Sequence, residues 1–194
     1  MVTDAGVTPL HLAAASNSPE CVSQLLEQGA AVDAAAADGK TPVHYAAQTW
    51  SASCLEELLN RGADIFARDH QGWTALHSAA HAGVMEPIKF LLLQGFDVGA
   101  RTAAGKTALH LCARAANDHC LRELLRLRAP VNARDDQGRT ALHEAARGTN
   151  EKVTRVLLES GADRRARDAE GHAPADLAIT MAMQRLIRRW AIAA

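Results

Sequence analysis

Glycine recurs every 33 residues along nearly the whole chain, and this period constrains the fold more than any other feature. Threonine follows two residues after each of the first five glycines, histidine comes three residues later, and paired leucines follow in phase. A period of about 20 to 50 residues predicts stacked copies of one supersecondary unit. The glycines are Gly6, Gly39, Gly72, Gly105, Gly138 and Gly171, and the histidines are His11, His44, His77, His110 and His143.

Each unit has the pattern of two short helices joined by a tight turn. In residues 69–101, Thr74 is suited to cap the first helix, and Gly83 permits a left-handed turn at its end. The second helix is predicted over about 86–93, with Gly95 closing it. Helices this short are marginal in water by themselves, so each unit must bury its apolar side against its neighbours.

Three segments carry a family resemblance, namely Gly-Lys-Thr-Pro-Val-His-Tyr-Ala-Ala (39–47), Gly-Trp-Thr-Ala-Leu-His-Ser-Ala-Ala (72–80) and Gly-Arg-Thr-Ala-Leu-His-Glu-Ala-Ala (138–146). Together with Leu-Leu-x-x-Gly-Ala-Asp they resemble ankyrin repeats over essentially the whole chain. The resemblance implies an all-α solenoid with short β-hairpins, a concave face of hairpin tips and first helices, and a role in protein binding. We expect a single domain, 1–194, with repeats at about 3–35, 36–68, 69–101, 102–134 and 135–167 and a sixth, capping repeat at 168–194.

Two departures from the repeat predict local differences. Asp176 stands where earlier units have histidine, and the last helix, expected around 181–190, is rich in arginine, as suits a cap whose outer face meets water. Arg128 replaces the closing glycine of the fourth unit. Because a non-glycine residue at positive φ costs on the order of 1 kcal/mol, we expect a strained turn there.

The histidines and cysteines are typical of structural residues. Stacked helices lie roughly 8–10 Å apart, too far for repeat histidines to share one metal ion, so we expect each imidazole to bond turn backbone and threonine. Cys21, Cys54 and Cys120 share a register that we expect to face inward, and Cys112 replaces an alanine. Buried free thiols favour a reducing compartment, the cytoplasm or the nucleus.

Several function classes are disfavoured by the sequence. It contains no nucleophile elbow, phosphate loop or His-Glu-x-x-His motif, so we expect no enzyme, no cofactor and no metal. The 21 basic and 22 acidic residues give a net charge of −1, which is unlike a general nucleic-acid binder. No apolar run is long enough to span a membrane, and the first residues lack the pattern of an export signal.

Charge is uneven along the repeats. The first three sum to −4, −1 and −1, whereas the fourth and fifth sum to +4 and +1. Arginine recurs at one register beside the hairpin tips, in Arg68, Arg101, Arg134 and Arg167. In the family that this chain resembles, this register and two others face the groove. The others hold Lys40, Trp73, Lys106, Arg139 and His172 at the tips and Gln48, His81, Arg114 and Arg147 on the first helices.

The leading hypothesis is a non-enzymatic, monomeric adaptor that binds an acidic protein segment on this face across repeats 2–5. Arginine and tryptophan are enriched at binding hot spots, and Trp73 is the expected anchor. The candidate contacts are Gln48, Arg68, Trp73, His81, Arg101, Lys106, Arg114, Arg134, Arg139 and Arg147. An alternative for Arg68 and Arg167 is pairing with neighbouring aspartates, whereas Arg101, Lys106, Arg114 and Arg147 have fewer local acids.

Three further readings stay open. The chain is also compatible with a targeting or substrate-recruiting segment of a larger enzyme, channel or ubiquitin-ligase subunit. Asn132, which follows Leu124-Leu125 at the hydroxylation register of the resembled family, is a candidate substrate of an asparaginyl hydroxylase, although Pro130 replaces the usual acidic residue. Trp50 is expected to cover a helix junction or make a second contact, and Trp190 to pack on the cap or touch a further C-terminal segment.

Overall fold

The computed structural model describes residues 3–190. The chain divides into two compact units, Met1–Asp97 and Val98–Ala194, called unit 1 and unit 2 below. Each unit is described by itself, and the domain boundaries expected from the sequence stay a prediction.

Unit 1 consists of three helix pairs, with each first helix packed against its second helix. First helices α1 and α3 also pack side by side, as do α3 and α5, and second helices α2 and α4 form a parallel row. The helices are α1 (Pro9–Ala15), α2 (Pro19–Glu27), α3 (Pro42–Ala46), α4 (Ser53–Asn60), α5 (Ala75–Ala82) and α6 (Met85–Leu93).

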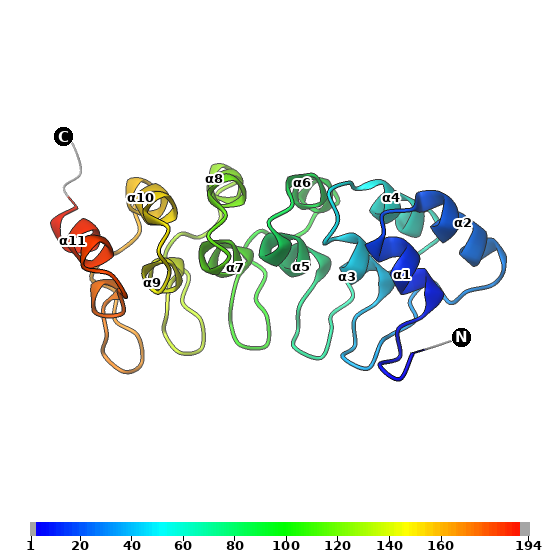
Figure 1. The fold of residues 1–194 in the computed structure, drawn as a ribbon, viewed down its shortest axis with the longest axis horizontal. Coiled ribbons are helices and arrows are strands. Elements are labelled where there is room, and N and C mark those ends of the chain that lie inside the picture. The colour runs from blue at the N-terminus through cyan, green and yellow to red at the C-terminus, as the bar shows by residue number, and fades with distance from the viewer. Residues whose placement is uncertain (1–2, 191–194) are drawn as a thin grey trace. The chain divides into compact units, whose positions relative to one another are not determined.

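Unit 2 repeats this arrangement (Figure 1). First helices α7 and α9 lie between the row of second helices and the loops that project on the other side. The elements are α7 (Ala108–Arg114), α8 (Asp118–Arg126), α9 (Ala141–Ala146), α10 (Glu151–Glu159), the 3-10 helix η1 (Pro174–Asp176) and α11 (Met181–Arg189). Helices α8 and α10 pack together, and α11 packs on η1 and α10.

The helix boundaries follow the sequence signals. Thr74 is the N-cap of α5, and equivalent threonines cap α1, α3, α7 and α9. Gly83 ends α5 in the left-handed conformation, with φ 73°, as expected. Arg128, at the register of the closing glycines, has φ 64°. The prediction of a strained turn at Arg128 is therefore confirmed, because arginine has the Cβ that makes this region unfavourable.

The loops between repeats are hairpin turns without strands, which corrects the expectation of short β-hairpins. In residues 3–190 no residue is in a β-strand. One hairpin closes through bonds from the Asp69 amide to the Trp73 carbonyl and from the Gly72 amide to the Asp69 carbonyl. Neighbouring hairpins share a single backbone bond, such as that from the Asp136 amide to the Ala104 carbonyl at 3.1 Å, which is too little for a β-ladder.

The cores combine small residues of the first helices with leucines of the second helices. Leu58 in unit 1 and Leu124 in unit 2 share one register, and both are fully buried. Thr154 and Met183 join α10 to α11 through a hydroxyl–sulfur contact of 3.1 Å. Within residues 3–190, no helix has the length and apolar character needed to cross a bilayer.

In the last repeat, an aspartate takes the place of the histidine that accepts a backbone bond at the start of the first helix. The Asp176 carboxylate accepts a bond from the Ala173 amide at 3.0 Å, the bond that histidine accepts in the earlier repeats, and this bond is the main cause of its lowered pKa. Asp176 also pairs with Arg188 of α11 at 3.2 Å. Asp176 thus keeps the bond to the amide at the helix start. It does not replace the second histidine bond, which in earlier repeats reaches the carbonyl of the next hairpin.

The cysteine prediction needs one correction. All four cysteines are free thiols, and Cys54, Cys112 and Cys120 are buried, but Cys21 is exposed. Helix α2 packs against α1 and α4, and these contacts leave Cys21 in solvent. The pKa of Cys112 is raised by its hydrogen bond with Cys120 and by burial.

Candidate protein-binding surface

The repeat histidines fix the hairpins to the helices, as the sequence predicts. In His110, Nδ1 lies 3.2 Å from the Thr107 amide and 2.9 Å from its hydroxyl. On the other side of the ring, Nε2 lies 3.0 Å from the Arg139 carbonyl of the next hairpin. A neutral ring with its proton on Nε2 accepts at Nδ1 and donates to the carbonyl. Burial lowers the pKa of His44, His110 and His143, which favours this neutral form.

A buried aspartate holds the backbone of the hairpin tip at Trp73 and at Arg139. The Asp135 carboxylate accepts hydrogen bonds from the Gln137 and Arg139 backbone amides. In unit 1, the Asp69 carboxylate accepts hydrogen bonds from the equivalent amides, including that of Trp73 at 2.8 Å. Both aspartates are buried. The backbone that carries Trp73 and Arg139 is therefore held rigidly before any partner arrives.

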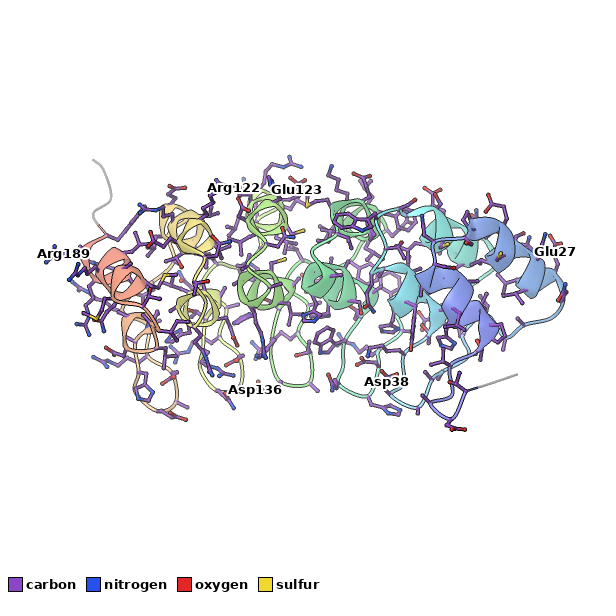
Figure 2. All side chains as sticks on the ribbon, in the orientation of Figure 1. Glu27, Asp38, Arg122, Glu123, Asp136 and Arg189 are labelled. Carbon is purple, nitrogen blue, oxygen red and sulfur yellow. The ribbon has the colours of Figure 1, made fainter. Side chains whose placement is uncertain are left out.

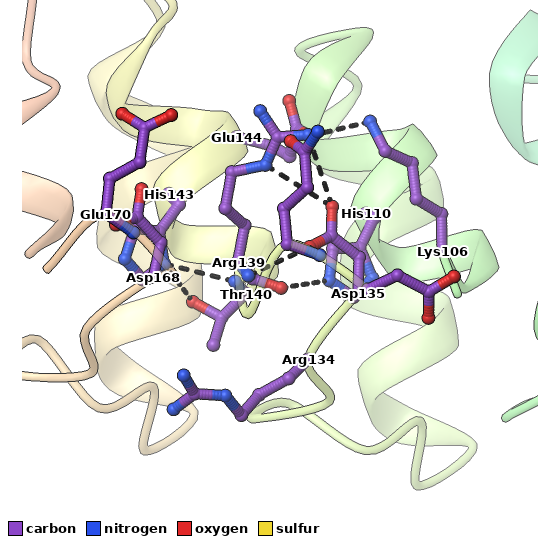
Figure 3. A network of polar contacts seen from close by, with 12 residues as sticks. Lys106, His110, Arg134, Asp135, Arg139, Thr140, His143, Glu144, Asp168 and Glu170 are labelled. Carbon is purple, nitrogen blue, oxygen red and sulfur yellow. Dashed lines mark hydrogen bonds and ion pairs between the residues drawn. The ribbon is translucent and has the colours of Figure 1, made fainter. Parts of the chain in front are cut away.

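Four charged side chains in unit 2 form a network that the sequence did not reveal (Figure 3). The Lys106 ammonium lies 2.7 Å from the Glu144 carboxylate. Arg139 lies 3.3 Å from Asp135 and 3.9 Å from Glu144. The sequence predicts fewer local acids for Lys106 than for Arg68 and Arg167, but Lys106 pairs with Glu144, which comes from the next first helix. Two cations and two carboxylates balance each other within the network.

Arg114 and Arg147 rim the cleft above this network. The cleft has a volume of about 340 Å³ and is lined by Arg114, Arg139, Glu144, Arg147 and Gly148. Arg114 is the last residue of α7 and Arg147 is the C-cap of α9, and both are exposed. In the described part of the chain neither forms an ion pair, unlike Arg139. The two guanidinium groups are therefore the uncompensated charges of the cleft.

The arginines beside the hairpin tips mainly hold backbone carbonyls. Arg101 donates to the Arg134 carbonyl at 2.8 Å and pairs with Asp136 at 3.1 Å, which contradicts the expectation that it has few acidic neighbours. Arg134 donates to the Arg167 carbonyl of the next hairpin. Arg68 donates to the Gly72 carbonyl and Arg167 to the Gly171 carbonyl. Arg101 and Arg134 therefore join neighbouring hairpins, and Arg68 and Arg167 close their own hairpins.

Unit 1 carries an aromatic pair at the equivalent positions. Trp73 is partly exposed, and its ring meets that of the exposed His81 edge-on, with centroids 5.4 Å apart. Gln48, at the His81 register of the preceding repeat, is exposed and bonds the His44 carbonyl of its own helix. The candidate residues of unit 1 thus lie at the surface, as the binding hypothesis requires.

The two other tryptophans and Asn132 have distinct surroundings. Trp50 is 81% exposed and so covers no helix junction. Trp190 is partly exposed beside Leu158 and Arg164. The Asn132 amide group donates to the Gly161 carbonyl at 3.1 Å and accepts from the Asp163 amide at 2.8 Å. Asn132 therefore links two repeats, a role that the register alone did not indicate.

Metal-binding chemistry has no support in the described residues. Between residues 3 and 190, no three His, Cys, Asp or Glu side chains gather closely enough to hold an ion. Four repeat histidines, His11, His44, His110 and His143, use both ring nitrogens for hydrogen bonds.

The fold and this surface define a class of protein, the helical repeat protein with a hairpin-bearing face. The family model described as "Ankyrin repeats (3 copies)" matches residues 1–69, 51–135 and 76–168. The chain belongs to the ankyrin repeat family, whose domains are generally protein–protein interaction modules and typically non-enzymatic.

Two solved structures illustrate the similarity. The ankyrin repeat domain of human ASB11 is 30% identical, with a TM-score of 0.86, and the match covers 100% of this chain and 88% of that one. The ankyrin repeat domain of Bcl-3, described as a unique member of the IkappaB protein family, is also 30% identical, with a TM-score of 0.78 and coverage of 97% and 85%. The comparison with curated proteins gives no match.

Proposed function

We propose that this chain is a non-enzymatic adaptor that binds an acidic segment of a partner protein, with the main contact at Arg114 and Arg147. The observation that carries the proposal is the charge arrangement of their cleft. Lys106 and Arg139 are already neutralised by Glu144 and Asp135, whereas the two rim arginines form no ion pair within the described residues. A carboxylate of the partner meets two guanidinium groups that need not break an existing pair.

The charge of the whole unit supports an acidic partner. Residues 98–194 contain 17 basic and 11 acidic side chains, a net charge of +6. A surface of one sign speeds encounter with a segment of the opposite sign and suppresses binding of basic segments. The cleft is also lined by the buried Glu144, whose carboxylate is held by the partly buried Lys106 at 2.7 Å.

The aromatic pair in unit 1 suits an apolar residue of a partner protein. Trp73 is held at its backbone by Asp69 and by the Nε2 of His44, which lies 2.9 Å from the Trp73 carbonyl. A rigid, partly exposed indole offers contact area at a low cost in conformational entropy. Trp73 is therefore proposed as the apolar anchor, and its substitution by alanine should weaken binding of a natural partner without changing the salt dependence.

The charge contact can be tested with a defined acidic probe. The measurement is fluorescence anisotropy with a labelled peptide of alternating glutamate and serine, against the same peptide with glutamine in place of glutamate. The variant is Arg114→Glu/Arg147→Glu. Its matched control is Arg122→Glu/Arg126→Glu, which makes the same change in net charge at two exposed residues of α8. Figure 2 shows Arg122 on the side of α8 that is away from the hairpin loops.

We expect the first variant to bind the glutamate peptide about tenfold more weakly, since each exposed charge contact is worth up to about 1 kcal/mol. Its dependence on salt should also become shallower. The control should lose much less, because it alters only the long-range field. Equal losses in the two variants would show that binding follows net charge alone, and would contradict a site at Arg114 and Arg147.

A further inference from the structure

The last repeat of unit 2 holds a second basic cleft, which shares no lining residue with the cleft at Arg114 and Arg147. Its volume is about 580 Å³, and its polar lining comes from Arg164, Arg165, Arg167, Asp176 and Arg188. The arginines come from two segments, the loop after α10 and the end of α11. Four guanidinium groups and one carboxylate give this small surface a net charge of +3.

Among the arginines of this cleft, Arg164 and Arg167 are held in place by backbone carbonyls without being neutralised. Arg164 donates to the Arg188 carbonyl at 2.6 Å, and so binds the end of α11. Arg167 donates to the Gly171 carbonyl at 2.6 Å. Arg188 alone among them pairs with a carboxylate within residues 3–190, that of Asp176. Each guanidinium has five N–H donors, so a carbonyl bond fixes its position and leaves other donors for a ligand.

Another cleft adjoins this basic cleft, and part of its lining is apolar. It measures about 550 Å³ and shares Arg164 and Arg165 with the basic cleft. Its other lining includes Leu158 and the partly exposed Trp190. A ligand that fills both clefts therefore needs an anionic group next to an apolar one.

We propose that this pair of clefts binds a phosphorylated serine or threonine of a protein segment, with a large apolar residue beside it against Trp190. A phosphate carries about −1.5 to −2 charges and three acceptor oxygens, which matches several forked donors better than a carboxylate does. A protein segment is favoured over nucleic acid because the whole chain has a net charge of −1, unlike the strongly basic domains that bind nucleic acid.

The first test uses peptide arrays with one fixed position and randomised neighbours. The fixed residue is phosphoserine in one array, serine in the second and glutamate in the third. The proposal predicts retention of the protein on the first array, with selection of an aromatic or large aliphatic residue next to the phosphoserine. No retention, or equal retention on the serine or glutamate array, overturns it.

The best phosphopeptide then serves as a labelled probe for variants. Arg165 is exposed, and its side chain forms no hydrogen bond or ion pair with the described residues. The Arg165→Glu substitution should therefore weaken binding of the phosphopeptide at least about tenfold. Arg155→Glu, an exposed change of equal charge on α10, should leave binding nearly unchanged. Trp190→Ala should remove the selection for an apolar neighbour. Circular dichroism melting checks that all variants stay folded.

Three results contradict the proposal at this stage. They are full binding by Arg165→Glu, an equal loss in Arg155→Glu, and displacement of the probe by a single-stranded oligonucleotide at lower concentration than by the unlabelled phosphopeptide. The Arg114→Glu/Arg147→Glu variant should still bind the phosphopeptide. This result separates the present proposal from the proposed adaptor surface, since either can fail while the other stands.

Discussion

Units 1 and 2 are built on the same registers but present opposite chemistry. Residues 1–97 carry 4 basic and 11 acidic side chains, a net charge of −7, whereas unit 2 carries +6. The tip register holds Trp73 in unit 1 and Arg139 in unit 2, and both are positioned by a buried aspartate. At the helix register, His81 corresponds to Arg114. The repeat therefore determines where a side chain lies, and the individual residue determines what it can bind.

The largest expected effect concerns what the units share. Leu58→Ala and Leu124→Ala remove fully buried side chains at one register, and each should lower the free energy of unfolding by about 2–5 kcal/mol. Urea unfolding measures both. Leu93→Ala is the control, because Leu93 is 85% exposed. A loss in only one of the two core variants would show that the units do not share one packing scheme.

Acid should weaken both units through their histidines. Burial holds the pKa of His44, His110 and His143 below the unfolded value of about 6.5, so the unfolded chain binds more protons between the two values. Stability is therefore complete above about pH 6.5 and falls as the pH drops toward the folded pKa values.

Urea titrations between about pH 8 and pH 5 measure this loss. The exposed His119 provides the control, since His119→Ala should keep the same pH dependence. The carboxylate of Asp176, whose pKa is lowered, contributes only at a more acidic pH. An unfolding free energy that stays constant down to about pH 5 would contradict the neutral-histidine arrangement.

A smaller effect separates the units at one backbone position. Gly62 in unit 1 and Arg128 in unit 2 share the closing register, with φ 83° and 64°. Arg128→Gly should raise the free energy of unfolding by about 1 kcal/mol, and Gly62→Arg should lower it by about the same amount. A Cβ at Gly62 meets no atom within 4 Å, so backbone conformation alone accounts for the cost. Changes of the same sign in both variants would refute this reading.

The sequence predicted what depends on the period, and missed what depends on long side chains crossing between repeats. The threonine caps and the histidine Nδ1 bonds follow from residues three positions apart, and the Nε2 bonds and the positive φ of Arg128 follow from the repeat register. The Lys106–Glu144 pair spans 38 residues, and the exposure of Cys21 depends on which helices cover α2. Register arithmetic would have placed Glu144 near Lys106, because 38 is one period plus five.

The central claim is that Arg114 and Arg147 contact the acidic partner segment. The most direct measurement is an NMR titration of the isotope-labelled protein with the glutamate–serine peptide, following the Nε–Hε resonances of the arginines. The resonances of Arg114 and Arg147 are expected to shift with the peptide concentration, while those of Arg122 and Arg126 are not. Shifts confined to Arg122 and Arg126, or spread evenly over all the arginines, would contradict it.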